Sequence, residues 1–83
     1  MKVICRSEYH LGSPADFDVY KYKKGKVKEM AEADYEWCKN THQEIENEDD
    51  IEDALESDEC KSVEIFTDSR SIVYEVCEVK EGF

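Results

Sequence analysis

Ten carboxylates and no lysine or arginine occupy residues 44 to 59. Repulsion between the carboxylates of such a block destabilises the folded state. A chain that retains the block accepts this loss of stability, which solubility alone would not require. The remaining twelve acidic residues are offset by eleven basic ones, so nearly all of the formal net charge of −11 lies in this segment. We call its carboxylates the acidic segment: Glu44, Glu46, Glu48, Asp49, Asp50, Glu52, Asp53, Glu56, Asp58 and Glu59.

The length of the chain limits it to one small core. A chain of 83 residues buries little more than roughly 60% of its unfolded surface and has no material for a second core. Its apolar content of 40% is enough for a globule and too high for a fully disordered chain. We therefore expect a single folded domain over residues 1–83.

The first thirty residues favour strands. Residues 2–9 alternate between an apolar and a polar face, which predicts a strand. Gly12 to Pro14 would end it in a short capped turn. The β-branched and aromatic residues 17–22 predict a second strand, and residues 27–30 its return strand after a lysine-rich turn.

The pattern then becomes helical. Its apolar stripe recurs at steps of four and three, at Ala31, Tyr35, Cys38, His42 and Ile45. Asp34 is a candidate N-cap for a helix that begins late. A second, shorter stripe at Ile51, Ala54 and Leu55 lies within the acidic segment. The remaining positions from Glu46 onward are polar or charged and must face water.

The last part of the chain predicts a hairpin. Its strands cover residues 63–66 and 72–79, and the second has apolar residues on both faces, which favours a central place in the sheet. The order β-β-β-α-α-β-β predicts an α+β domain, an antiparallel sheet with one or two helices on one face.

The cysteines suggest no metal centre or disulfide framework. Cys5, Cys38, Cys60 and Cys77 are dispersed, with no C-x-x-C pair, so reduced thiols that pack as small apolar groups are expected. Cys38 and His42, four residues apart, would share a helix face, where packing is commoner than zinc ligation or a catalytic pair. We expect no metal and no cofactor.

Two other features each have two interpretations. Trp37 is either a half-buried core aromatic or an exposed anchor at an interface, with Tyr35 beside it. The five lysines of residues 21–28 either solvate a strand edge or contact an acidic surface. The glycine spacing of a calcium loop and the known catalytic motifs are absent, so an enzyme is not expected.

The acidic segment leads to a functional hypothesis. A continuous helix over residues 44–59 would carry about one charge per 2.2 Å, and duplex DNA carries about one per 1.7 Å. The segment, with Trp37 and Tyr35 adding apolar contact, is thus predicted to bind the cationic groove of a nucleic-acid-binding protein or nuclease complex. The strongly acidic balance argues against direct binding of nucleic acid.

In size and charge, the chain resembles the small phage-encoded inhibitors that imitate nucleic acid, such as anti-restriction proteins, anti-CRISPR proteins and inhibitors of uracil-DNA glycosylase. The resemblance implies a non-enzymatic inhibitor, and no residue is carried over. The alternative is a structural or adaptor module that packs on a partner or a second copy, with the charge serving solubility. With no apolar run of membrane-spanning length and no signal peptide, a cytoplasmic monomer or homodimer is expected, in the host cytoplasm if the chain is phage-encoded.

Overall fold

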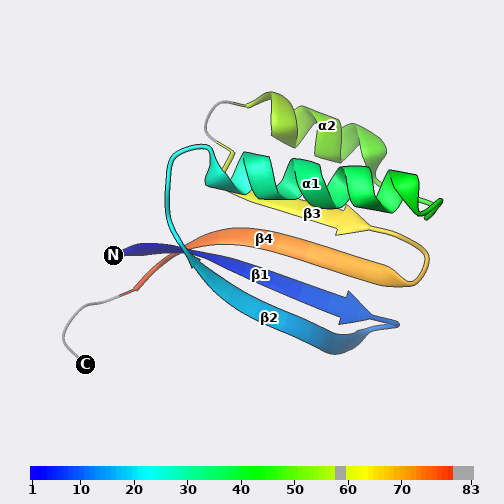
Figure 1. The fold of residues 1–83 in the computed structure, drawn as a ribbon, viewed down its shortest axis with the longest axis horizontal. Coiled ribbons are helices and arrows are strands. Elements are labelled where there is room, and N and C mark those ends of the chain that lie inside the picture. Colours follow the sequence, from blue (N-terminus) through cyan, green and yellow to red (C-terminus); the bar gives the residue numbers. More distant parts are fainter. Residues whose placement is uncertain (58–59, 80–83) are drawn as a thin grey trace.

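A computed structural model describes residues 1–57 and 60–79, which form one antiparallel sheet of four strands with two helices on one of its faces (Figure 1). The elements are β1 (Lys2–His10), β2 (Ser13–Lys21), α1 (Lys26–Asn40), α2 (Glu48–Glu56), β3 (Ser62–Phe66) and β4 (Arg70–Glu78). The strands lie in the order β2-β1-β4-β3. The predicted α+β class is confirmed, and so is the central position of the last strand.

The first hairpin is tighter than the sequence suggested. Leu11 and Gly12 both have positive φ, 52° and 82°, as a two-residue hairpin turn with the native strand twist requires. The predicted capped turn around Pro14 is wrong, because β2 resumes at Ser13 and contains the proline. Pro14 is tolerated there because β2 is an edge strand, and the pairing with β1 shifts by one residue at this point.

The predicted third strand, residues 27–30, is wrong. These residues form the first turn of α1, which follows Gly25 with its φ of 80°. The side chains buried along α1 are Val27, Ala31, Tyr35 and Cys38, so the helical stripe begins one turn earlier than Ala31. The β-branched valine suggested a strand, but its burial one turn before Ala31 favours the helix.

The C-terminal end of the apolar stripe also differs from the prediction. The helix ends at Asn40, and His42 is exposed with a φ of 58°, so Cys38 and His42 do not share a helix face. Ile45 lies beyond the helix and forms an isolated bridge with Thr67. Asp34 lies in the middle of α1 and not at its N-cap, which is Gly25.

The core lies between the helices and one face of the sheet. Ile4, Ile65, Ile72 and Tyr74 are almost fully buried beneath the buried stripe of α1 and Ile51 of α2. The helices contact mainly β3 and β4. Figure 1 shows β2 at the opposite edge of the sheet from the helices, where eight of its nine residues are exposed and the ninth, Tyr20, is half-buried.

Candidate functional site

The acidic segment divides into a short extended part and a helix. Glu44 and Glu46 lie in the extended part, beside the bridge that Ile45 forms with Thr67, and the backbone N–H of Glu46 donates to Phe66 at 2.8 Å. Six further carboxylates lie on α2, which begins only at Glu48, so the helix is shorter than the one used above to estimate the charge density. Asp58 and Glu59 lie outside the described residues.

Helix α2 is held by one apolar face. Ile51 is fully buried, Ala54 and Leu55 pack beside it, and every charged residue of the helix is exposed. The hydroxyl of Tyr35 on α1 donates to Glu52 at 3.3 Å. The helix therefore presents its charged face to water from a docked position, as the short apolar stripe predicted.

Asn47 fixes the start of α2 to the sheet. It occupies the N-cap position, but its side chain makes no capping bond to the helix. Its amide instead donates to the carbonyl of Glu64 at 2.7 Å and accepts from the N–H of Phe66 at 3.0 Å. One side chain thus satisfies a donor and an acceptor on the outer edge of β3, which would otherwise be exposed.

The described carboxylates of the acidic segment form no ion pair with a cation of the described residues, although Glu52 interacts electrostatically with Lys39 of α1. Within residues 1–57 and 60–79 the ion pairs lie elsewhere, joining Arg6 to Glu8 and Asp34, Arg70 to Glu8, and the N-terminus to Glu78. Six carboxylates along the nine residues of α2 span eight steps, about 12 Å, or roughly one charge per 2 Å. The charge density inferred for a longer helix therefore holds for the shorter one.

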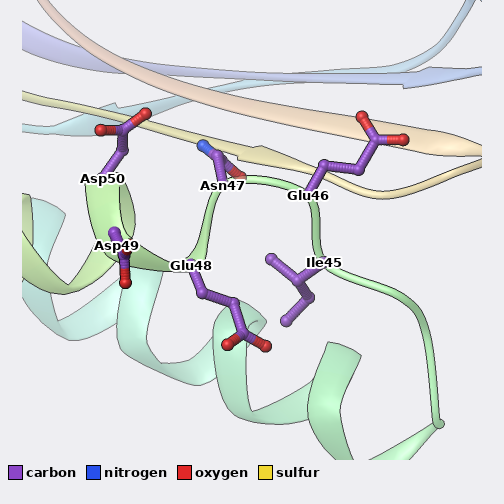
Figure 2. A pocket seen from close by; sticks show the side chains of 6 residues that line it. All are labelled: Ile45, Glu46, Asn47, Glu48, Asp49 and Asp50. Carbon is purple, nitrogen blue, oxygen red and sulfur yellow. The ribbon is translucent and has the colours of Figure 1, made fainter.

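A pocket of about 440 Å³ opens at the N-terminal end of α2 and is lined by the six residues from Ile45 to Asp50. Figure 2 shows that the Asn47 amide points toward the sheet, whereas the carboxylates of Glu46, Glu48, Asp49 and Asp50 diverge. Across the described chain, no group of three or more His, Cys, Asp or Glu side chains is placed to hold a metal ion. The carboxylates form a spread surface of negative charge and do not converge on a point.

Of the two aromatic residues predicted to join this surface, Tyr35 contacts it only through its hydroxyl, and Trp37 lies apart from it. Tyr35 is buried, and only its hydroxyl reaches the acidic segment, through Glu52. Trp37 is 44% exposed, and its ring lies against the guanidinium of Arg70 at 4.9 Å. A step of two residues on a helix turns by about 200°, so Trp37 faces away from α2.

A second polar cluster was not predicted. Arg6 on β1 donates from Nε to Asp34 of α1 at 3.1 Å and to the hydroxyl of Tyr74 at 3.0 Å, and that hydroxyl in turn donates to Asp34. Glu8 lies 3.7 Å from Arg6 and 3.3 Å from Arg70. With Trp37, the four charged residues line a pocket of about 240 Å³. Two cations and two anions balance here, so the cluster ties α1 to the sheet without adding net charge.

The surroundings of this cluster perturb proton binding. Burial, followed by the hydrogen bond to Asp34, raises the pKa of Tyr74 above its ordinary value of 10.0. Burial also raises the pKa of Tyr35, Cys38 and Cys60. The pKa of Cys5 is raised first by its contact with Cys77, which lies on the neighbouring strand. Although the cysteines are dispersed in sequence, two of them thus meet, and no disulfide joins any of the four.

These shifts predict alkaline destabilisation. Each group holds its proton more tightly in the folded state than in the unfolded chain, so the free energy of unfolding is unaffected below about pH 9 and falls as the pH rises above it. Urea unfolding between pH 7 and pH 11 measures the loss. Tyr74→Phe should reduce the slope above pH 10, and an identical slope in both proteins would contradict this assignment.

Searches of known proteins gave no relative of this chain. No family model, no curated protein and no solved structure matches it. None of the helices in the described part of the chain is long and apolar enough to cross a membrane. The function is therefore inferred from the surface described above.

Proposed function

We propose that this chain is a non-enzymatic inhibitor that binds a cationic nucleic-acid-binding protein or nuclease complex through the acidic segment. The observation that carries the proposal is the row of exposed carboxylates on α2, which have no ion-pair partner among the described residues. The helix carries one charge per roughly 2 Å of its axis, which is close to the value for duplex DNA, one per about 1.7 Å of axis. Anti-restriction and anti-CRISPR inhibitors of phage are the class that this surface fits.

Rigid presentation strengthens the proposal. A disordered acidic tail must be ordered when it binds, whereas α2 is already fixed by Ile51 and by the Asn47 amide. Desolvating these carboxylates breaks no ion pair with the described part of the chain. A cationic groove is therefore attracted to a preformed surface, and its charge steers the approach.

The first experiment identifies the partner. The chain is immobilised, exposed to a bacterial lysate from which nucleic acid has been digested, and eluted with a salt gradient. Partners that elute late in the gradient are identified by mass spectrometry and challenged with duplex DNA. We expect a DNA-binding or RNA-binding protein that duplex DNA displaces, because both ligands would occupy one groove.

Neutralising α2 should abolish binding to that partner and leave the fold intact. The variant changes Asp49, Asp50, Glu52, Asp53 and Glu56 to the corresponding amides. We expect at least about a hundredfold loss of affinity by calorimetry, since several charge contacts disappear together. The fold should be equally or more stable, because repulsion between like charges one helical turn apart costs roughly 0.2 to 0.5 kcal/mol per pair.

A matched control separates position from total charge. Glu29, Glu32, Glu64, Asp68 and Glu75 are exposed, lie outside the acidic segment and carry the same formal charge. Their neutralisation should weaken binding only modestly. An equal loss in both variants would mean that net charge alone matters. No loss in either would favour the adaptor module, for which the exposed Trp37, Phe17 and Val19 provide apolar contacts.

A further inference from the structure

The sheet has two edges, and within the described residues only one of them is covered by another part of the chain. The outer edge of β3 is covered by the Asn47 amide and by the segment around Ile45 and Glu46. The outer edge of β2 lies at the other side of the sheet. In the described residues, no backbone group of another strand or loop pairs with that edge. Long unpaired edges of this kind are templates for a further strand.

The hydrogen-bond pattern shows which residues of β2 face outward. Met1 and Val79 exchange two backbone hydrogen bonds, of 2.7 and 3.0 Å, and such pairs alternate along an antiparallel ladder. The odd-numbered residues of β1 therefore bond to β4 and the even-numbered ones to β2. By the same alternation, Phe17, Val19 and Lys21 direct their backbone N–H and C=O groups away from β1. Consistently, the N–H of Phe17 is bonded locally, to the Asp16 carboxylate at 2.9 Å.

The side chains of β2 have opposite charges at its two ends. Asp16 and Asp18 occupy its first part, and Lys21 begins a run of lysines that continues at Lys23 and Lys24. Between the two ends lie Phe17 and Val19, which are 62% and 54% exposed. When two such strands run antiparallel, the acidic part of each lies beside the basic end of the other. The complementarity is one of position along the edge and not of directly opposed side chains, because Asp16 and Asp18 lie on one face of the strand and Lys21 lies on the other.

We propose that two copies of this chain associate through their β2 edges in antiparallel register centred on Val19, which joins their sheets into one of eight strands. In this register Val19 lies opposite Val19 of the second copy, and Phe17 lies diagonal to it on the same face. The carboxylates of Asp16 and Asp18 then lie opposite tyrosines 22 and 20 of the second copy. A register centred on Asp18 is disfavoured, because it would place two carboxylates directly opposite each other.

The distribution of charge permits this association despite the net charge of −11. The acidic segment lies next to β3, and β4 and β1 separate β3 from β2. With neighbouring strands about 4.8 Å apart, the acidic surfaces of two copies would point to opposite ends of the joined sheet, beyond a Debye length of about 8 Å from each other. The two surfaces therefore repel each other weakly.

Charge-reversal variants test the proposal by sedimentation equilibrium. The wild-type chain should dimerise with a dissociation constant on the order of 10 μM, as suits a small interface. Asp16→Lys with Asp18→Lys makes the edge basic, and Lys21→Glu with Lys24→Glu makes it acidic. Each variant alone should associate at least about tenfold more weakly, because the charges at these four positions along the joined edge then all have the same sign. An equimolar mixture of the two variants should restore the dimer.

The two variants also distinguish edge pairing from a general charge effect. The aspartate variant lowers the magnitude of the net charge by four units, so it would dimerise better than the wild type if net charge controlled association. All four positions are exposed, and circular dichroism should show an unchanged fold in both variants. In the wild-type dimer, the Val19 and Lys21 amides should exchange with deuterium more slowly than in the monomer.

Several results would overturn the proposal. A wild-type chain that remains monomeric at about 200 μM, well above the expected dissociation constant, has no such interface. Variants that dimerise as well as the wild type place the contact on another surface. A mixture that fails to restore the dimer rules out antiparallel pairing of the edges. None of these results bears on binding through the acidic segment, which is tested with a different set of variants.

Discussion

Replacing Arg6 with methionine should lower the free energy of unfolding by about 3 kcal/mol, near the lower end of the range for breaking a buried ion pair. The arginine side chain is 13% exposed and its partner Asp34 is 23% exposed, so both charges are largely shielded from water. Without the guanidinium, the partners left among the described residues are the Tyr74 hydroxyl for Asp34 and Arg70 for Glu8. Urea unfolding at pH 7 measures the loss.

A double variant shows whether the loss comes from the stranded carboxylate. Arg6→Met combined with Asp34→Leu removes both charges and keeps comparable volume. The double variant should lose clearly less free energy of unfolding than the sum of the losses in the two single variants, because neither charge is then left without its partner. Additive losses would mean that Arg6 contributes through packing of its aliphatic stem and not through its ion pair.

Ile51→Ala should be comparably damaging, with a cost of about 2 to 5 kcal/mol for a fully buried aliphatic side chain. Ile51 is the fully buried residue of α2, so the cavity would form where the acidic helix meets the core. In a domain of this size, that loss is a large fraction of the total stability. Thermal unfolding and hydrogen exchange of the α2 amides would report it.

The milder change Ile51→Val serves as the control, with an expected cost of about 0.5 to 1.5 kcal/mol. If α2 is released before the rest unfolds, its amides should lose protection in Ile51→Ala while those of β1 and β4 keep theirs. Affinity for the partner of the acidic segment should fall with that protection. Unchanged α2 exchange in Ile51→Ala would show that other contacts are enough to hold the helix.

Much of the fold was accessible from the sequence because the apolar periodicity is strong where the core forms. The alternation in residues 2–9, the apolar residues on both faces of 72–79 and the stripe at Ala31, Tyr35 and Cys38 each correspond to an observed element. The failures lie at boundaries. The β-branched side chain of Val27 favours a strand, whereas its spacing of four residues from Ala31 favours the helix that forms. The positive φ of His42 ends the helix despite an intact pattern, a choice that local sequence does not reveal.

The charged surface was predictable, and the polar cluster was not. A run of carboxylates is visible in sequence, and its exposure follows from the lack of neighbouring cations. Arg6, Asp34 and Tyr74 are separated by 28 and 40 residues, and only the tertiary structure brings them together. One signal was available, since Asp34 precedes the buried Tyr35 on a helix that faces a strand carrying the inward-facing Arg6. The separation of Trp37 from the acidic helix likewise depends on which flank of α1 the second helix occupies.

The Asn47 amide also determines how far association can proceed. A molecule with two open sheet edges can add copies at both, and successive addition produces a filament without a fixed length. Here the amide occupies the outer edge of β3, so each copy can add one neighbour, at the edge of β2. Together with the backbone of Ile45 and Glu46, this one asparagine side chain therefore limits any edge-to-edge assembly to a closed pair related by a two-fold axis, with one α2 helix at each end.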